Sequence, residues 1–539
     1  MEGSVTDSPY RLLLRAASLI PASHFFVAAL FASVIFLYSF LEAHFLHDLL
    51  NGFRGDPVSI NCDSSSRLFH SVVSKCRTLH GRYLATPWLC SPHLQTAFLS
   101  FMGRSPDFIY RRRLFHTSDR GTIALDWLLS SDVMEDSASM VQDNQIHDET
   151  PILIVIPGLT SDSESSYIKH LVYTMARSGW NVVVSNHRGL GGITITSDCF
   201  YNAGWTKDIE EVVNHLHQHH LEASLFVVGT SIGANVLVKY LGEQGENVPI
   251  MGAAAICSPW DLLICDRFIN RRPVQKMYDK VLTIGLQGYA KLHQTIMSRL
   301  ANWDGIVKSR SVREFDNHAT RILGKYETVD TFYRRCSSSI FVGKVSVPLL
   351  CISALDDPVC TSEAIPWDEC RANKNIVLAT TPHGGHLGFY EGITARRLWW
   401  VRAVSEFLGI LQSSQSMRRR AVAQAPLPSA LESSVDQGPY INVDEDGMVA
   451  AVGDEQANCT VEDTTKDTIL TQPSVRYTEE GPAPIKAWLS RFSRPSNISI
   501  ALLAYIAMVT TWPLIGPALL LAIKRKFKKG MPSMALKRS

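Results

Sequence analysis

Ser231 lies in a Gly-x-Ser-x-Gly pattern, flanked by Gly229 and Gly233. An apolar run over residues 225–228 precedes the pattern, and a helical pattern over residues 234–241 follows it. A tight turn from strand to helix needs small residues beside the serine, and it exposes the serine hydroxyl above the carboxyl end of a sheet. The N-terminus of the following helix favours negative charge that develops there. The segment therefore predicts a nucleophilic serine.

A serine hydroxyl becomes a strong nucleophile only beside a base that an acid orients. Asp356 and Asp357 follow one later apolar run, and His383 and His386 follow the next. Loops at the carboxyl ends of parallel strands build the site of an open sheet, so we expect one of these carboxylates and one of these imidazoles to meet the serine there. The histidines could instead be metal ligands, but no carboxylate or cysteine lies at suitable spacing beside them. We therefore expect no metal and no cofactor.

Backbone N–H groups must receive the negative charge that forms on the substrate oxygen during acyl transfer. The first long strand, residues 152–156, ends in Pro157-Gly158-Leu159. We expect the N–H of Leu159 in this loop and the N–H of Ile232, directly after the serine, to form the oxyanion hole.

The elements that position these residues follow a regular pattern. Residues 109–117 and 122–129 flank a four-residue turn and predict a hairpin. Short apolar runs then alternate with helical patterns, at residues 152–156, 181–185, 225–228, 250–257, 348–353 and 375–379. Continuous apolar strands between helices indicate a parallel sheet that is covered on both faces. Residues 258–345 lack clear strands and predict a helical insertion, and residues 396–411 predict a closing amphipathic helix. The fold class is α/β.

Composition sets the remaining limits. The chain has 539 residues, of which 46% are hydrophobic and 19% charged, so a sizeable core can form. Its 52 Lys and Arg against 51 Asp and Glu give a net charge of +1, which argues against a nucleic-acid partner. The 11 cysteines include no Cys-x-x-C pair, which leaves room for one or two disulfides but not for a dense disulfide framework.

Two hydrophobic stretches lie outside the catalytic region. Residues 25–41 follow an N-terminal segment (residues 1–24) and are long and apolar enough to cross about 30 Å of hydrocarbon as a helix. We expect a transmembrane anchor here. A signal peptide is the first alternative, but no small-residue cleavage site follows the stretch. A buried core helix is the second, but long helices without a polar face are rare in soluble domains.

The second stretch, residues 495–523, precedes a basic tail, residues 524–539. Two prolines in its middle leave open whether it spans the bilayer or forms a hairpin in one leaflet. Residues 413–484, between the catalytic region and this stretch, are poor in aromatics and predict a disordered linker. We expect a protein of the endoplasmic reticulum or another endomembrane. The orientation of the catalytic domain stays open, because two spans would place it in the lumen and a hairpin would not.

From about residue 82 to residue 412 the chain resembles the α/β-hydrolase superfamily. Within it, the chain is similar to the group of the mammalian abhydrolase-domain 1 and 3 proteins, the bacterial YheT-like esterases and the plant EMB8-like proteins. The motifs that carry the resemblance are Pro92-His93-Leu94-Gln95-Thr96, Pro157-Gly158-Leu159-Thr160, Asn186-His187-Arg188-Gly189, Gly229 to Asn235, Arg313-Glu314-Phe315-Asp316, Asp356-Asp357-Pro358 and Gly385-His386-Leu387-Gly388.

The resemblance implies an α/β-hydrolase fold with a mostly parallel central sheet, in which residues 258–345 form a helical cap. It implies that Ser231 is the nucleophile, His386 the base and Asp357 the acid, since relatives carry the acid directly before proline. The expected activity is hydrolysis of carboxylic esters, in particular lipid esters, as in monoacylglycerol lipases, phospholipases or short-chain carboxylesterases. An acyltransferase with the same triad and a non-catalytic membrane scaffold are the alternatives.

Overall fold

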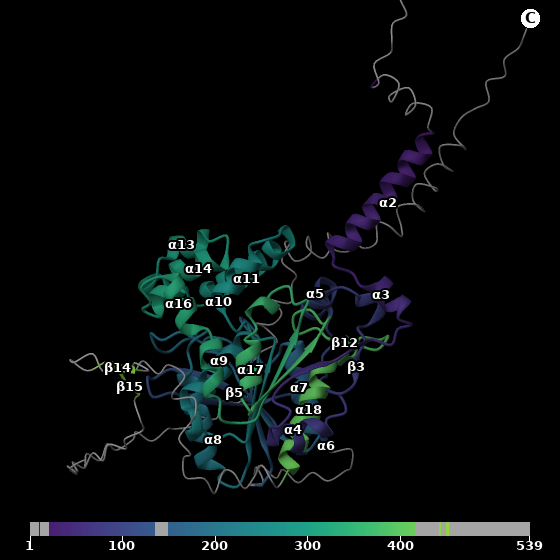
Figure 1. Ribbon diagram of the computed structural model, residues 1–539. Coiled ribbons are helices and arrows are strands. Elements are labelled where there is room, and N and C mark those ends of the chain that lie inside the picture. The colour runs from purple at the N-terminus through teal and green to yellow at the C-terminus, as the bar shows by residue number, and fades with distance from the viewer. Residues whose placement is uncertain (1–9, 11–20, 135–148, 415–440, 444–448, 452–539) are drawn as a thin grey trace, which may run out of the picture.

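The computed structural model describes residues 10, 21–134, 149–414, 441–443 and 449–451 (Figure 1). Most of the N-terminal segment (residues 1–24) and of the expected linker (residues 413–484) lies outside these residues, as do the second hydrophobic stretch (residues 495–523) and the basic tail (residues 524–539). Within the expected linker the structure describes residues 413–414 and a strand pair at residues 441–443 and 449–451. In the described part of the chain, the ten cysteines are free thiols.

A nine-stranded sheet in the order β2-β11-β10-β9-β8-β6-β7-β5-β4 forms the centre of the domain. Its parallel strands are β6 (Ile152–Ile156), β7 (Asn181–Ser185), β8 (Leu225–Thr230), β9 (Gly252–Ile256), β10 (Leu349–Ala354) and β11 (Ile376–Thr381). The hairpin β4 (Arg111–His116) and β5 (Thr122–Leu128) joins β7 in antiparallel register. The predicted hairpin and the six predicted strands are confirmed, with ends that coincide or shift by one or two residues.

Helices cover both faces of the sheet, which explains why its central strands are apolar throughout. Alternate residues of β6 show the two sides: Leu153 and Val155 belong to one core cluster, and Ile152 and Ile154 belong to the other. The first cluster packs against α7 (Ser166–Arg177) and α18 (Trp399–Ser413), and the second packs against α8 (Lys207–His219), α9 (Ile232–Gln244) and α17 (Trp367–Ala372). The predicted closing helix corresponds to α18, preceded by a short hairpin of β12 (Tyr390–Glu391) and β13 (Arg397–Leu398).

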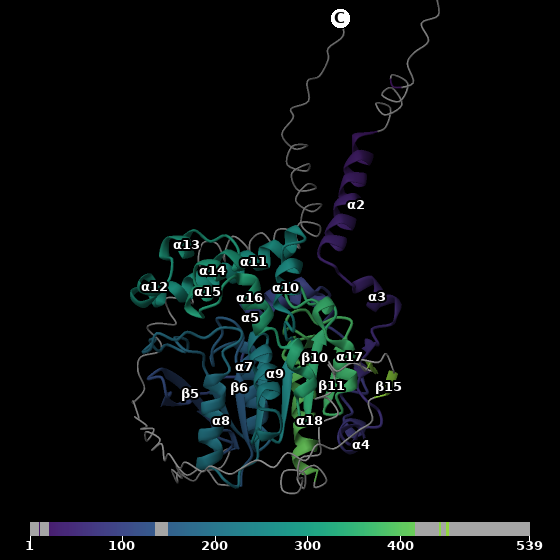
Figure 2. The ribbon, with the colours of Figure 1, turned by 60° about the vertical axis from the view of Figure 1, so that its left-hand side comes forward.

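A layer of helices lies over the carboxyl ends of the parallel strands (Figures 1 and 2). The chain between β9 and β10, where a helical insertion was expected, contains α10 (Leu262–Ile269), α11 (Pro273–Leu292), α12 (Gln294–Leu300), α13 (Trp303–Lys308), α14 (Val312–His318), α15 (Thr320–Leu323), α16 (Val329–Cys336) and the 3₁₀ helix η4 (Ser339–Lys344). Its own apolar cluster, which includes Leu286, Met297 and Phe315, also takes in Phe200 and Tyr201 from the loop after β7. This shared cluster fixes the insertion over the end of the sheet.

The folded domain begins before the expected boundary at residue 82. The strand β2 (Ser59–Asn61) extends the sheet by pairing antiparallel with β11, and α4 (Arg67–Ser71) places Leu68 in the core. The smaller elements of this region are α3 (Phe45–Leu50), β1 (Asp56–Pro57), η1 (Val73–Lys75), β3 (Arg82–Tyr83), η2 (Pro87–Leu89) and α5 (Pro92–Met102). A three-residue strand at a sheet edge has no detectable periodicity, so the boundary could not be read from the pattern.

In the described part of the chain, one helix is long and apolar enough to cross a membrane by length and composition. It is α2 (Ala22–Phe40), in which residues 23–40 have a mean hydropathy of 1.8 and none of them is buried. The helix projects away from the domain on the side of the cap helices (Figure 2). The remaining described elements are α6 (Ser131–Met134), η3 (Gly245–Asn247), η5 (Ser362–Ala364) and the pair β14 (Ile441–Val443) and β15 (Val449–Ala451).

Candidate active site

Ser231 occupies the turn between β8 and α9 in a backbone conformation that side chains rarely adopt, with φ of 53° and ψ of −122°. The neighbouring glycines are required sterically. A Cβ added at Gly229 would lie 2.4 Å from the carbonyl oxygen of Gly233, and one added at Gly233 would lie 2.4 Å from the carbonyl oxygens of Ile156 and Pro157. Strain of this kind persists only where surrounding contacts over-determine it. The turn directs the hydroxyl out of the sheet at the N-terminus of α9.

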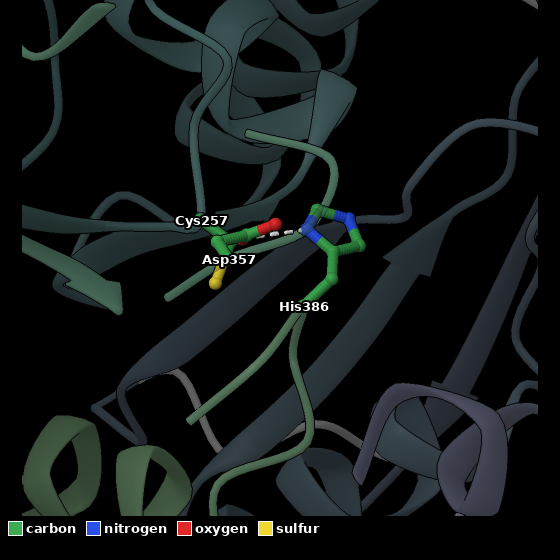
Figure 3. A group of neighbouring side chains, drawn as sticks. All are labelled: Cys257, Asp357 and His386. Atoms are coloured by element: carbon green, nitrogen blue, oxygen red, sulfur yellow. Dashed lines mark hydrogen bonds and ion pairs between the residues drawn. The ribbon is translucent and has the colours of Figure 1, made fainter. Parts of the chain in front are cut away.

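The imidazole of His386 lies between Ser231 and Asp357. Its Nε2 is 3.0 Å from Ser231 Oγ. Its Nδ1 is 2.8 Å from Asp357 Oδ2, the contact that Figure 3 shows. The other carboxylate oxygen of Asp357 accepts hydrogen bonds from the backbone N–H groups of Val359 and Cys360, both at 2.8 Å. With the ring proton on Nδ1, Nε2 is free to accept the proton of the serine hydroxyl. The structure thus brings together the three side chains that the resemblance singles out.

The other aspartate and the other histidine of the two loops do not touch the serine. Asp356 accepts a hydrogen bond from the N–H of Gly385 at 2.9 Å through Oδ1, and its Oδ2 lies 3.3 Å from Nδ1 of His383. The two adjacent carboxylates therefore have separate partners. Asp357 contacts the imidazole that reaches the serine, and Asp356 contacts the loop that carries this imidazole.

The loop after β6 runs beside the serine, as expected for an oxyanion hole. A Cβ added at Gly158 would lie 3.3 Å from Ser231 Cβ. Gly158 N–H donates to Tyr167 Oη at 3.0 Å and Thr160 N–H donates to Tyr201 Oη at 3.3 Å. Between them, the N–H of Leu159 makes no hydrogen bond within the described residues.

The second expected donor, the N–H of Ile232, is the first of α9 and has no partner inside the helix. Ile232 and Leu159 line the same cavity as Ser231. Both residues thus lie at the cavity into which the serine opens.

A cavity of about 690 Å³ opens at the serine and extends beneath the cap. Besides Ser231 and His386, its lining is mostly apolar and comes from both layers, including Phe200, Ile269, Leu286, Met297, Phe315 and Leu323. Three carboxyl groups interrupt this apolar lining: Glu164 is exposed, Asp266 is half-buried, and the buried one is Asp316 of α14. It accepts hydrogen bonds from Thr320 Oγ1 and Tyr333 Oη, at 2.6 and 2.8 Å, and burial raises its pKa to about 6. An acyl chain fits such a cavity better than a charged ligand does.

Two side chains that the sequence pattern did not single out contact His386 and Asp357. The hydroxyl of Thr96 accepts a hydrogen bond from the backbone N–H of His386 at 2.9 Å. The thiol of Cys257, at the end of β9, lies beside the carboxylate of Asp357 (Figure 3). Thr96 lies inside one of the motifs that carry the resemblance, but nothing in the sequence marks Cys257.

Among the described residues, Cys257, Asp357 and His386 form the group whose ligand atoms are close enough to hold a metal ion, all within 4.8 Å of one another. A metal there would have to take the place of the His386 Nδ1 proton and break the bond to Asp357. Burial, and then the charge of Asp357, raise the pKa of the Cys257 thiol well above its ordinary value, which disfavours the thiolate that metals bind. The geometry therefore suits proton transfer and not metal binding.

The Asn-His-Arg-Gly motif after β7 holds loop geometry. His187 Nε2 lies 2.9 Å from the carbonyl oxygen of Pro157, and its ring stacks on Tyr201, which contacts the same loop. Arg188 is buried between the carboxylates of Asp119 and Asp208. His187 therefore contacts the loop that carries Leu159, and Arg188 connects the loop after β7 to Asp119 and Asp208.

Comparison with known proteins places the site in a wider context. A family model described as "Serine aminopeptidase, S33" matches residues 147–391, which include Ser231, Asp357 and His386. The chain is 36% identical over 350 residues to the "Embryogenesis-associated protein EMB8" of Picea glauca, covering 64% of this chain and 76% of that protein. It is 31% identical over 329 residues to the "Phospholipase ABHD3" of Homo sapiens, covering 61% and 78%. It is 26% identical over 386 residues to the "Medium-chain fatty acid ethyl ester synthase/esterase 2" of Saccharomyces cerevisiae, covering 60% and 85%.

Proposed function

The chain belongs to the α/β-hydrolase superfamily, in the abhydrolase-domain group of EMB8 and ABHD3, and we propose that it is a membrane-anchored serine hydrolase that cleaves carboxylic esters of lipids. The observation that carries the proposal is the line of hydrogen bonds from Asp357 through His386 to Ser231, at 2.8 and 3.0 Å, at the mouth of an apolar cavity. The names of the relatives, a phospholipase and an esterase among them, support ester hydrolysis.

In the proposed mechanism the Ser231 hydroxyl attacks the ester carbonyl while His386 Nε2 takes its proton. The N–H groups of Leu159 and Ile232 receive the negative charge on the carbonyl oxygen. His386 then gives the proton to the departing alcohol, which leaves an acyl group on Ser231. Water, deprotonated by the same imidazole, releases the carboxylic acid. Asp357 holds the ring with its proton on Nδ1 and stabilises the imidazolium that forms.

The membrane part of the proposal rests on α2. Its apolar stretch of 18 residues, none of them buried, is long enough to span the hydrocarbon of a bilayer, and the domain follows directly after it. A tether of this kind holds the cavity near esters that partition into the membrane.

The test is an activity measurement on the full-length protein in detergent micelles. We expect hydrolysis of p-nitrophenyl esters of graded chain length, of a monoacylglycerol and of a phospholipid, with the free fatty acid as product. Ser231→Ala is the matched control and should lower kcat by several orders of magnitude, because only the oxyanion hole and substrate binding then remain. Peptide p-nitroanilides test the peptidase description of the family model, and cleavage of these amides without cleavage of esters would contradict the proposal.

One relative named as an ester synthase favours acyl transfer to an alcohol as a second candidate function. The acyl-enzyme is common to both reactions, and they differ only in whether water or an alcohol attacks it. Addition of ethanol to the assay separates them. If fatty acid remains the main product, the protein is a hydrolase; if ethyl ester accumulates at the expense of fatty acid, it is an acyltransferase.

A further inference from the structure

The segment that follows α2 folds back onto the loops that carry Asp357 and His386. His44 precedes α3, and its ring stacks on the ring of His383, with centroids 3.7 Å apart and planes inclined by 9°. Nδ1 of His44 lies 2.7 Å from Asp48 Oδ2, and both side chains are buried. The backbone N–H of His44 donates to the carbonyl oxygen of Cys90 at 2.8 Å. The imidazole of His44 is therefore fixed from two sides against the His383 ring.

His383 connects this contact to the catalytic pair. Its Nδ1 lies 3.3 Å from Asp356, which directly precedes Asp357. The other oxygen of Asp356 accepts the N–H of Gly385, which directly precedes His386, at 2.9 Å. Asp356 and Gly385, which are joined by this hydrogen bond, thus directly precede the two residues that act as acid and base in the proposed mechanism.

The loop that carries His386 needs outside support. Gly384 and Gly385 have φ of 156° and 59°, and the non-glycine residues Leu387 and Phe389 also have positive φ, of 62° and 41°. Such backbone conformations cost energy, and a residue keeps one only where the surrounding structure holds it in place. Thr96 contacts this loop at His386, and His44 contacts it at His383.

Charge strengthens the contact. The titratable groups that face His383 are His44, His47, Asp48, Asp56 and Asp356, from α3, β1 and the loop after β10. Burial by itself lowers the pKa of His383, but the hydrogen bond to Asp356 and the charges of the three aspartates outweigh it and raise the pKa. Burial, and then the charge of His383, lower the pKa of His44. The pKa values of the two stacked rings thus shift in opposite directions, which favours positive charge on the ring that contacts Asp356.

We propose that His44 is a positioning residue, which by stacking on His383 holds the loops of Asp357 and His386 at hydrogen-bond distance from each other. The inference rests on the proposed function and extends it: the segment between the membrane helix and the sheet becomes part of the framework of the active site. His44 itself does not line the cavity and does not touch the serine.

The test measures kcat and KM of His44→Ala for p-nitrophenyl butyrate, with the full-length protein in the same detergent as the wild type. A small displacement of a catalytic group costs about 10- to 100-fold in rate, so kcat should fall by this factor. KM should stay within about twofold, because the substrate cavity is unchanged. The control is His217→Ala, which removes an exposed histidine of α8 and should leave both constants unchanged.

A second pair of variants decides the matter if His44→Ala does not fold. His44→Phe and His44→Leu both remove the hydrogen bond to Asp48, but only phenylalanine keeps a planar ring over His383. We expect the kcat of His44→Phe to exceed that of His44→Leu by about tenfold.

Three outcomes would overturn the inference: a wild-type kcat in His44→Ala, a rise in KM alone, or equal kcat values in the Phe and Leu variants. The wild-type protein tests the proposed function separately. If it hydrolyses the ester and Ser231→Ala does not, that proposal stands whatever the His44 variants show.

Discussion

Replacing Asp357 by asparagine tests the role of the acid with almost no change in shape. Oδ1 of Asp357 accepts two backbone N–H groups at 2.8 Å, so the amide oxygen of the substituted asparagine must take this place and its NH₂ must face His386. Nδ1 of His386 would then have to accept, and the ring proton would move to Nε2. An imidazole with its proton on Nε2 donates to Ser231 and cannot take the serine proton.

The expected loss follows from this tautomer. In serine hydrolases a wrongly protonated base lowers kcat by about 10⁴-fold, which corresponds to about 5.5 kcal/mol of transition-state stabilisation. Asp356→Asn is the matched control, since it makes the same chemical change one residue away. It weakens the contacts to His383 and Gly385 but leaves the tautomer of His386 intact, so we expect a loss of about tenfold.

The assay is hydrolysis of p-nitrophenyl butyrate at saturating concentration, with melting curves to show that both variants fold. A loss in Asp356→Asn equal to or larger than that in Asp357→Asn would refute the assignment of the acid. A loss below about tenfold in Asp357→Asn would refute the reasoning about the tautomer.

Three further predictions concern the surroundings of the site. Gly233→Ala should destabilise the fold by about 1–3 kcal/mol, since the new Cβ meets the carbonyl oxygens of Ile156 and Pro157, and an unchanged denaturation midpoint would contradict this. Iodoacetamide at neutral pH should leave Cys257 unmodified in the folded protein, because burial raises the pKa of its thiol; rapid alkylation seen by mass spectrometry would contradict this. Because burial raises the pKa of Asp316 to about 6, the folded protein binds a proton that the unfolded chain releases near pH 4, so wild-type stability should fall as pH rises from about 4 to 6. Asp316→Asn should reduce this slope in thermal melts, and equal slopes in the two proteins would contradict the role of Asp316.

Much of the architecture follows from local pattern. The six parallel strands are continuous apolar runs because both sheet faces are covered. Such runs can be recognised in the sequence even when the neighbouring strands are not known. The glycines around Ser231 are recognisable because the turn excludes any side chain there. The order of serine, aspartate and histidine at strand ends predicted that the loops of Ser231, Asp357 and His386 lie at one edge of the sheet. The choice of Asp357 over Asp356 needed the resemblance to a family.

The contacts that the sequence does not reveal join residues far apart in the chain. Cys257 looks like any buried cysteine at a strand end until the fold places it against Asp357. In the sequence His44 is a polar residue after an apolar helix, and only the fold shows that its ring stacks on His383. The strand β2 has no hydrophobic pattern that would predict it, and it forms by pairing with the edge strand β11. Such features depend on tertiary packing, which a single sequence does not encode in any local period.

The most direct test of the account is covalent labelling of the full-length protein with a fluorophosphonate, followed by mass spectrometry of the modified peptide. The wild-type protein should take up one probe per chain, on the hydroxyl of Ser231, and Ser231→Ala should take up none. Modification of a different residue, or undiminished labelling of the alanine variant, would show that the nucleophile lies elsewhere and that the proposed chemistry is wrong.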